Sequence, residues 1–511
     1  MKDQKKSGVF ISYITIIINN IVSIFLTPFL ISCLGISEYG VYQIVCSIAA
    51  YLMIVNFGMG TIITRNISKY LAEKDKKGEE NFLYMAAWIT GILFVMVLLV
   101  SGIIYLFLDK IFSNSLTVNE LYIAKKIYLI SCTNIAITLI INSFTGILNG
   151  YEKFAVNNLF NMAKILLRVF LIFVLLKLGF KAIGIVLVDL FVSILMLLLQ
   201  YLYSKLKLNI KAKFYYFDKK LFHESLIFSI AIFLQTIVSQ INTNLDRVIL
   251  GVMTTADVVA VYSQALMLYA LFSTFTGTIS SVFLPQATRM LVQDSSPQQM
   301  TDMVIKPGRI QYMIASLFTT GFIIFGKQFL YTWLGQEFVG AYIPTIILFI
   351  PLGIVMSQGT VDSILDAMMK RFVRSIILIA MAVLNIILSI IFIRKIGYVG
   401  AAIGTTASLF IGHLFIMNLY YYKVIGLDII RMIKEVYLKT AFSSAIICFT
   451  AYFIYHNLLI RDGWFNLLLN IGIYTVIFAV SAYVFMMKQY ERELFKSFFN
   501  LRKKKEGEVL R

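Results

Sequence analysis

The sequence predicts an all-α polytopic membrane protein with about 14 transmembrane helices, arranged as two six-helix bundles plus two C-terminal helices. Three observations support this fold class. Hydrophobic residues make up 59% of the 511 residues and charged residues only 14%, against roughly 25% charged residues in soluble domains. Apolar runs long enough to cross a bilayer recur along the whole chain. Short patterns in the first half also return in the second half, which is typical of duplicated transporter folds.

Each predicted span is an apolar run close to the ~20 residues that a helix needs to cross the hydrocarbon core. Polar connections, most of them short, separate the runs. The predicted spans are 9–31, 39–63, 82–108, 121–148, 158–178, 181–203, 223–250, 258–283, 309–332, 342–366, 375–394, 398–422, 438–456 and 465–487.

The internal repeat divides these spans into two halves. Val41-Tyr42 recurs as Val261-Tyr262, and Lys177-Leu178-Gly179 recurs as Lys395-Ile396-Gly397. The offset is about 220 residues with hydropathy in phase, which indicates a duplicated six-helix unit. The predicted domains are an N-terminal six-helix bundle at 1–204, a basic cytoplasmic linker at 205–221, a C-terminal six-helix bundle at 222–424, two additional transmembrane helices in 425–487 and a basic cytoplasmic tail at 488–511.

The distribution of basic residues predicts the orientation. Most of the 45 Lys and Arg residues fall in the connections that are cytoplasmic if the N-terminus is inside, as the positive-inside rule requires. We therefore expect a multi-pass protein with both termini in the cytoplasm. The net charge of +19 then needs no nucleic-acid partner, because basic loops such as 205–220 would lie against anionic membrane lipids.

Several kinds of chemistry have no sequence signal here. The four cysteines have no CxxC spacing, and the three histidines lie in different segments without a second ligand at helical spacing. No GxGxxG, Walker or GxSxG pattern occurs. We therefore expect no metal, no cofactor and no catalytic residues. The longest outer loop, 109–120, is a short polar connection, so a membrane-embedded glycan polymerase or transferase would have to hold its active site within the spans.

Two spans carry polar residues at steps of three or four, which places them on one helical face. In 9–31 these are Ser12, Thr15, Asn19, Ser23 and Thr27, and in 223–250 they are Gln235, Ser239, Asn242 and Asp246. At the repeat offset, Thr15 corresponds to Gln235 and Asn19 to Ser239. Either stripe alone could form interhelical hydrogen bonds, but the matched pair favours the wall of a polar cavity shared by the two halves.

Charged residues inside the spans are costly, at about 2.5–3.5 kcal/mol each near a helix centre, so each should have a partner or a function. Lys164 and Arg168 share one face of 158–178. Arg168 can pair with Asp189 across the hairpin at Gly179, while Lys164 can extend to the cytoplasmic surface. The alternative is a cationic cavity in which Lys164, Arg168 and Arg247 bind an anionic substrate. Asp189, Asp246 and Asp362 are candidates for ion coupling or for structural ion pairs.

The N-terminal run from Leu26 to Tyr42 resembles the opening of bacterial polysaccharide flippases of the Wzx type. Phe57-Gly58-Met59-Gly60 leading to Arg65-Asn66, and the run from Asn244 to Gly251, are similar to the second and seventh spans of that family. The family belongs to the multidrug/oligosaccharidyl-lipid/polysaccharide exporter superfamily. The resemblance extends over essentially the whole chain, although its motifs are short and degenerate.

The resemblance implies a V-shaped pair of six-helix bundles with two extra C-terminal helices, in the bacterial cytoplasmic membrane. It implies a flippase that moves an undecaprenyl-diphosphate-linked oligosaccharide to the outer leaflet by alternating access, with glycan assembly proteins as further candidate partners. An ion-coupled multidrug antiporter of the same superfamily is the main alternative. Cationic drugs would favour acidic or aromatic cavity groups, whereas the predicted cavity contains Lys164, Arg168 and Arg247.

Overall fold

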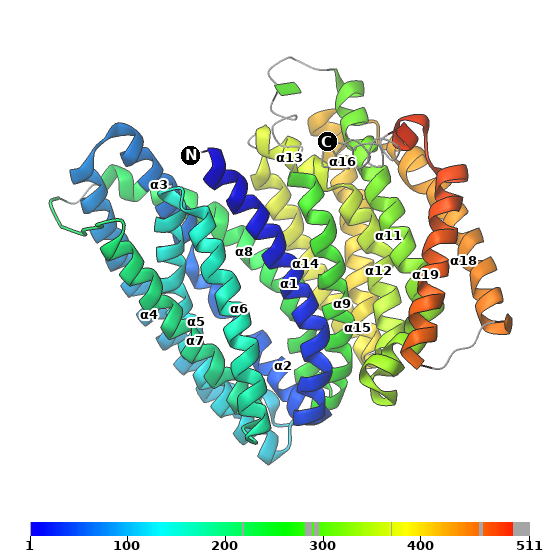
Figure 1. Ribbon diagram of the computed structural model, residues 1–511, viewed down its shortest axis with the longest axis horizontal. Coiled ribbons are helices and arrows are strands. Elements are labelled where there is room, and N and C mark those ends of the chain that lie inside the picture. Colours follow the sequence, from blue (N-terminus) through cyan, green and yellow to red (C-terminus); the bar gives the residue numbers. More distant parts are fainter. Residues whose placement is uncertain are drawn as a thin grey trace, which may run out of the picture. The chain divides into compact units, whose positions relative to one another are not determined.

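The computed structural model describes residues 2–216, 219–281, 289–290, 296–368, 370–458 and 463–493. Within these ranges every regular element is a helix (Figure 1). Thirteen helical segments of the described chain are long and apolar enough to cross a membrane, and each overlaps one predicted span. The remaining predicted span, 223–250, lies within the 35-residue helix α8 (Lys219–Met253). The predicted fold class, an all-α multi-pass membrane protein, is confirmed.

Contacts divide the chain into two compact units, Met1–Ser263 (unit 1) and Gln264–Arg511 (unit 2). Helix α8 therefore groups with the helices that precede it, although the repeat assigns it to the second half. A division by contacts does not test a division by internal repeat, so the predicted domain boundaries stay a prediction.

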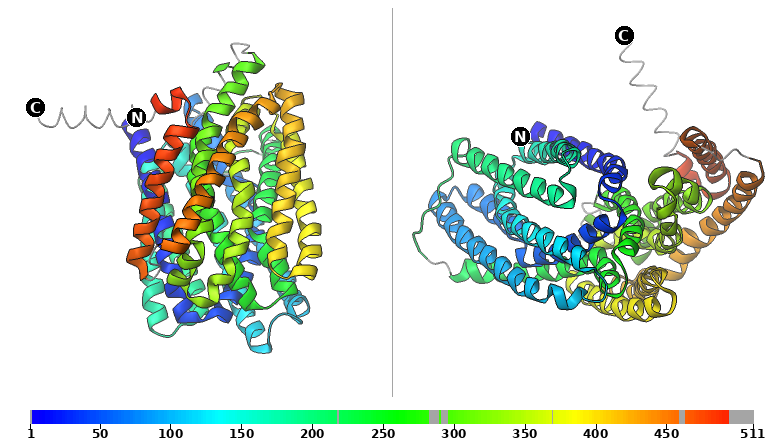
Figure 2. Two further views of the ribbon diagram at one scale, coloured as in Figure 1. Left: turned by 90° about the vertical axis from the view of Figure 1, so that its right-hand side faces the viewer. Right: turned by 90° about the horizontal axis from the view of Figure 1, so that it is seen from below.

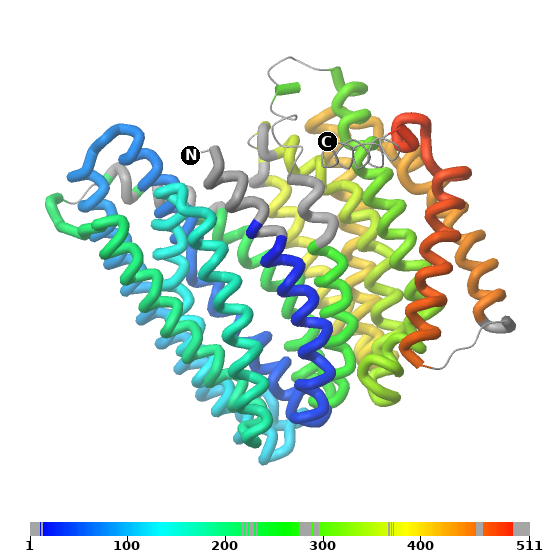
Figure 3. The backbone as a smooth tube through the Cα atoms, in the orientation of Figure 1, coloured from blue at the N-terminus to red at the C-terminus, as the bar shows by residue number. Residues whose placement is uncertain are grey.

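Unit 1 alternates direction through long helices joined by short turns, as the course of α4 to α7 shows (Figure 3). Its elements are α1 (Lys2–Leu34), α2 (Ile36–Tyr51), η1 (Leu52–Asn56), α3 (Met59–Glu73), α4 (Lys76–Phe112), α5 (Val118–Gly150), α6 (Phe154–Lys177), α7 (Lys181–Leu206), α8 and the first part of α9 (Ala256–Ser281).

Helix α5 forms the centre of unit 1, where it packs against α2, α3, α4 and α7. Small residues permit the closest of these approaches. A Cβ atom on Gly146 would lie 2.4 Å from the backbone oxygen of Gly60 on α3, so only glycine fits there. This packing of backbone on backbone is the usual way in which membrane helices associate.

The predicted span 39–63 is not one continuous helix. Its first part is α2, which continues into the short 3₁₀ turn η1, and Phe57 and Gly58 then adopt left-handed backbone with φ of 45° and 70°. Helix α3 begins at Met59 and extends the helical path to Glu73. Apolar composition continues through this break, so composition alone did not locate it.

Unit 2 contains the remaining helices, including π-helical turns at η3, η4 and η5. Its elements are the rest of α9, α11 (Pro297–Leu334), η2 (Gln336–Ala341), α12 (Tyr342–Ser357), α13 (Gly359–Ala367), α14 (Arg371–Ile396), α15 (Val399–Leu409), η3 (Phe410–Met417), α16 (Asn418–Ile425), α17 (Ile429–Met432), η4 (Ile433–Leu438), α18 (Lys439–Leu458), α19 (Gly463–Ser481) and η5 (Ala482–Met486).

The two added C-terminal helices, α18 and α19, pack against α11 (orange and red in Figure 2). A buried ion pair connects α11 to the segment that follows η5. Arg309 on α11 donates from Nε and Nη2 to both carboxylate oxygens of Glu491, at 2.7 and 3.2 Å, and from Nη2 to the Met486 backbone oxygen at 2.7 Å. Burial opposes ionisation of Glu491, but hydrogen bonds led by that from Arg309 outweigh it and lower its pKa.

Candidate functional site

Helix α1 is exposed on two separate faces. Ile17, Ile21 and Phe25 form an exposed apolar face, which suits contact with lipid. Asn19 is exposed as well, yet at about 100° per residue it points roughly 160° away from Ile17. A polar side chain at membrane depth needs water or a polar ligand, so the predicted polar stripe falls on this second face of α1.

Two other predicted stripe residues on α1 lie beside Asn19, whereas Thr27 is buried and the side chain of Ser12 lies outside the described part of the structure. Thr15 and Ser23 are half-buried, and their hydroxyls donate to backbone oxygens four residues earlier, at 2.8 Å in each case. Such bonds keep the hydroxyls satisfied within the helix while one side of each oxygen stays available. Thr15, Asn19 and Ser23 therefore share one face of α1, with Asn19 as its most accessible group, and their role as a cavity wall stays a prediction.

Helix α8 repeats this pattern with three exposed residues. Gln235, Ser239 and Asn242 fall within an arc of about 60°, and all three are exposed. Among the described residues, none of these side chains has a hydrogen-bond partner. Interhelical hydrogen bonding, the alternative explanation of the stripe, is therefore not observed for them.

Helix α6 contributes a third polar face, of which the pattern of charges predicts only Lys164 and Arg168. Asn157 and Asn161 precede Lys164 and Arg168 at helical spacing, and Asn161 is exposed. The exposed apolar residues Leu166 and Phe170 lie on the opposite side of the helix. The periodicity that revealed the other two stripes would also have found the two asparagines, since they continue the face of the cations.

Arg168 forms the ion pair that the hairpin geometry predicts. Its Nε donates to Asp189 Oδ1 at 2.5 Å and its Nη2 to Oδ2 at 3.2 Å. Both side chains keep some exposure, 32% for Arg168 and 21% for Asp189. Arg168 is thus largely neutralised by its neighbour on α7 and is held in a fixed orientation.

Lys164 lies one turn before Arg168 on α6 and is half-buried. It interacts electrostatically with Asp189 and Arg168, but within the described part of the chain it makes no hydrogen bond and no ion pair. Two cations therefore share the single carboxylate of Asp189. A lysine ammonium has three hydrogens, and no described residue accepts those of Lys164.

Asp246 and Arg247 point to different partners, as adjacent helical residues must. Asp246 is buried, and the Tyr262 hydroxyl donates to its Oδ2 at 2.7 Å. Arg247 donates from Nε to Ser263 Oγ at 3.2 Å and from Nη1 to the Asn244 side chain at 3.3 Å. Its Nη2 has no hydrogen-bond partner among the described residues, so one edge of the guanidinium remains available.

Helix α2 connects the two arginines within unit 1. Tyr42 and Cys46 of α2 lie within electrostatic range of Arg168, and Tyr39 and Cys46 lie within electrostatic range of Arg247. Helix α2 also packs directly against α8. The cations that were predicted from separate spans are therefore grouped around one helix, together with the hydroxyls of two tyrosines.

The sixth predicted charge, Asp362, lies in unit 2. Arg374 on α14 donates from Nη2 to Asp362 Oδ2 at 2.7 Å, a pairing that the sequence pattern does not predict. Nearby, Gln358 bonds both Asn418 at 3.1 Å and the imidazole of His413 at 3.3 Å. His413 is buried in the π-helical turn η3. Asp362 is thus part of unit 2, where it pairs with Arg374.

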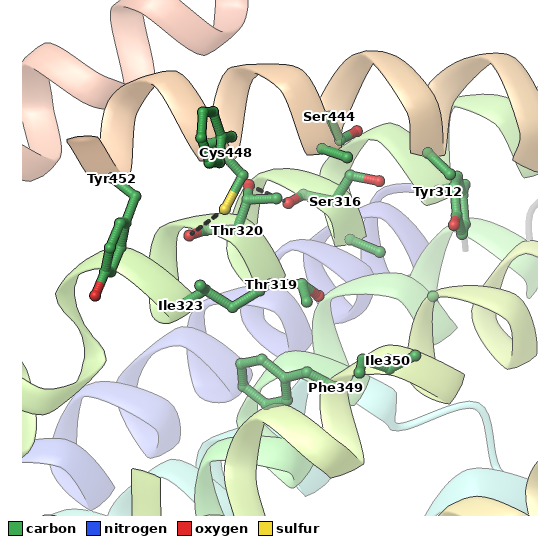
Figure 4. Close-up of a pocket in the computed structure, with 15 residues that line it drawn as sticks. Tyr312, Ser316, Thr319, Thr320, Ile323, Phe349, Ile350, Ser444, Cys448 and Tyr452 are labelled. Carbon is green, nitrogen blue, oxygen red and sulfur yellow. Dashed lines mark hydrogen bonds between the residues drawn. The ribbon is translucent and has the colours of Figure 1, made fainter. Parts of the chain in front are cut away.

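Unit 2 also contains an apolar cavity of about 530 Å³ between α11, α12 and α18 (Figure 4). The Thr320 hydroxyl donates to backbone oxygens of its own helix and accepts from the Tyr474 hydroxyl of α19 at 2.6 Å, and Cys448 Sγ lies 3.9 Å from the Thr320 backbone oxygen. No charged residue lines it among the described residues. Such a cavity suits an apolar chain and offers no charged partner to a phosphate.

Within its spans, unit 1 thus offers a region suited to an anionic ligand. In unit 1, three cations stand beside only two carboxylates, and exposed polar faces of α1, α6 and α8 accompany them. Ammonium and guanidinium groups bind phosphate oxygens through charge-assisted hydrogen bonds. Amide and hydroxyl groups on the same faces are the usual partners of sugar hydroxyls.

The fold is shared with solved membrane transporters. A structure described as "Lipid II flippase MurJ, inward closed conformation" matches with a TM-score of 0.75 and 20% identity, over 95% of this chain and 100% of that chain. An inward-facing multidrug resistance MATE family transporter of the MOP superfamily matches with a TM-score of 0.62 and 16% identity, over 80% and 99%. A MOP superfamily transporter from Pyrococcus furiosus matches with a TM-score of 0.54 and 15% identity, over 82% and 97%.

Sequence comparison places the chain in a family. No functionally curated protein sequence matches it significantly. The family described as "Polysaccharide biosynthesis protein" matches residues 6–291, which is more than half of the 511 residues. This match agrees with the motif resemblance to polysaccharide flippases, and the chain belongs to the polysaccharide biosynthesis protein family.

Proposed function

We propose that this protein is a flippase that moves a lipid-linked oligosaccharide, carried on undecaprenyl diphosphate, from the cytoplasmic to the outer leaflet of the bacterial plasma membrane. Family membership, the fold shared with a lipid II flippase and the cationic polar faces of unit 1 support this proposal. The substrate would reach its site from one side of the membrane at a time. The protein would then act as a transporter and not as an enzyme.

The observation that carries the proposal is the pairing of exposed polar faces with incompletely used cations. Asn19, Asn161 and Gln235 are exposed on helices whose other faces suit lipid. Lys164 and the Nη2 group of Arg247 keep donors that no described residue uses. A diphosphate would bind these donors, and the sugars would lie along the amide and hydroxyl groups.

The apolar part of the substrate has different needs. A prenyl chain can remain in the bilayer, and the cavity of Figure 4 would suit it or an ordinary lipid chain because its lining is apolar. That cavity alone would not distinguish the two. The specificity of the proposed transport therefore rests on the headgroup.

An ion-coupled multidrug antiporter is the second candidate, because MATE transporters share the fold. In the described part of unit 1, however, both intramembrane carboxylates already have partners, Asp189 with Arg168 and Asp246 with Tyr262. A cationic drug would also meet three cations there. The charge of the site thus favours an anionic substrate.

Depletion of the protein in its own host tests the function. We expect a completed lipid-linked saccharide to accumulate on the cytoplasmic leaflet, protected from impermeant glycosidases in intact cells, while no new glycan appears outside. If the lipid-linked unit instead reached the outer leaflet and stayed unpolymerised, the protein would be the polymerase. If glycan export continued and cells became sensitive to cationic drugs, the antiporter would replace the flippase.

A further inference from the structure

The segment that follows α7 is held against the cytoplasmic start of α4. We call residues 207–216 the strap (green beside the blue start of α4 in Figure 3). Asn81 Oδ1 accepts the backbone N–H groups of Tyr215 and Tyr216 at 2.9 and 3.1 Å, and the Lys213 N–H donates to the Glu80 backbone oxygen at 3.1 Å. Asn81 is only 2% exposed, so the strap is anchored on a buried group.

Side chains reinforce this attachment. The Tyr215 hydroxyl donates to Glu80 Oε2 at 2.8 Å, which raises the pKa of Tyr215. Phe214 packs on Tyr84 of α4 with ring centroids 5.4 Å apart, and Tyr84 packs in turn on Trp88 at 6.4 Å. Aromatic rings of this kind gather at the level of lipid headgroups.

The strap carries basic side chains that take no part in its hydrogen bonds to α4. Lys211 and Lys213 are exposed, and neither side chain has an ion-pair partner among the described residues. The carboxylate of Glu80 faces Tyr215, and that of Glu79 accepts from Lys76 at 3.0 Å. The strap therefore presents positive charge beside a row of aromatic rings.

An open apolar hollow of about 770 Å³ begins at the same place and follows one face of α4 into the membrane, and we call it the α4 groove. All of its lining residues belong to α4, among them Tyr84, Trp88, Gly91, Ile92, Val95 and Leu99. From Trp88 to Leu99 a helix rises about 16 Å, which matches the ~15 Å hydrocarbon depth of one leaflet. A Cβ atom on Gly91 would meet no atom within 4 Å, so glycine leaves this part of the groove open.

We propose that the strap and the α4 groove form a binding site for an anionic phospholipid of the cytoplasmic leaflet. The phosphate and the anionic headgroup bind Lys211 and Lys213, and one acyl chain lies in the groove over Gly91 and Leu99. Continuity of the basic strap with a groove one leaflet deep supports this occupant. The site is separate from the transport site, and its lipid would hold the strap that leads into α8.

Fluorescence quenching by brominated lipids tests the site directly, because Trp88 lines the groove. The full chain with Trp333→Phe and Trp464→Phe retains Trp88 as its single tryptophan. It is placed in phosphatidylcholine nanodiscs that contain increasing fractions of brominated phosphatidylglycerol or brominated phosphatidylcholine. One lysine near the membrane surface gives about a fivefold preference for anionic lipid, so two lysines give about a 30-fold preference. At low salt, the fraction of brominated phosphatidylglycerol that halves the fluorescence should therefore be about 30-fold lower than that of brominated phosphatidylcholine. This difference should decrease as salt is raised.

Matched variants separate the two parts of the site. Lys211→Gln with Lys213→Gln should make the two brominated lipids equal quenchers. Gly91→Phe should fill the groove and reduce quenching by both lipids, whereas Gly102→Phe, at another open glycine of α4 outside the groove lining, should not. Equal quenching by both lipids in the parent protein would overturn the lipid-site proposal and leave the transport proposal intact. Relief of quenching by stoichiometric undecaprenyl diphosphate would also overturn it, because the groove would then be an entrance for the substrate.

Discussion

Lys164 and Arg247 keep hydrogen-bond donors that no described residue uses, so both can bind a diphosphate. A hydrogen bond to a charged group contributes about 1.5–3 kcal/mol, or about 10- to 150-fold in affinity. We expect Lys164→Ala and Arg247→Ala each to abolish glycan export at normal protein levels. Lys164→Arg should retain much of the export because the charge is kept, although the fork of a guanidinium differs in shape from an ammonium.

Lys177 is the matched control for this experiment. It lies at the far end of the same helix α6, with its ammonium 4.4 Å from the Phe173 ring. Lys177→Ala removes a cation of equal size and should leave export unchanged. If both Lys164→Ala and Arg247→Ala retained full export, the assignment of these cations to the binding site would be wrong. The polar stripes alone would then have to hold the substrate.

Arg168 is expected to act through stability. Arg168→Ala leaves the Asp189 carboxylate without its bidentate partner, at a cost of about 1–3 kcal/mol for a partly exposed group. Protein abundance in the membrane should fall, as measured by quantitative immunoblotting. The double change Arg168→Ala with Asp189→Asn should recover abundance, because no unpaired charge remains. Equal abundance of the single variant and the wild type would show that Lys164 alone can neutralise Asp189.

At the scale of elements, the ion pair between Arg309 and Glu491 fastens α11 to the end of the C-terminal helices. Both side chains are almost completely buried, at 1% and 2% exposure. Removing one partner of a buried pair costs about 3–5 kcal/mol. We expect Arg309→Ala to lower the apparent Tm of the purified protein strongly. Arg309→Lys should not restore it, because an ammonium cannot span both carboxylate oxygens and the Met486 oxygen in one plane.

Arg431 provides the comparison. It pairs with Asp302 and Glu435 at 2.7 Å in each case, but it is 38% exposed. Exposed pairs contribute about 0–1 kcal/mol, so Arg431→Ala should change the apparent Tm little. If both variants lowered the Tm equally, burial would not be the reason for the stability of the Arg309 pair.

The elements show how far sequence reasoning extends. Apolar runs located the spans because burial in lipid requires ~20 apolar residues whatever the fold. The Arg168–Asp189 pair was predictable because a helical hairpin places residues at equal distances from its turn side by side at the same depth in the membrane. The partner of Arg309 is 182 residues distant, and only tertiary packing reveals it. Asn157 and Asn161 could have been predicted from the sequence, since their helical spacing places them on the same face as Lys164.

At the scale of the whole molecule, the distribution of basic residues predicts which ends face the cytoplasm. After replacement of the four native cysteines, Asn114→Cys in the turn between α4 and α5 should react with an impermeant thiol reagent in intact cells. Lys207→Cys, just after α7, should react only after the cells are opened. The reverse pattern would invert the orientation of unit 1 and with it the proposed direction of transport.

Transport of a defined substrate by the purified protein is the most direct test of the flippase proposal. Proteoliposomes would carry an undecaprenyl-diphosphate oligosaccharide in both leaflets, with an impermeant glycosidase outside. We predict that the wild type makes the inner pool accessible to the enzyme, and that Lys164→Ala with Arg247→Ala leaves it protected at equal protein incorporation. Protection of the inner pool by the wild type, together with exchange of a cationic drug for protons in the same vesicles, would contradict the proposal.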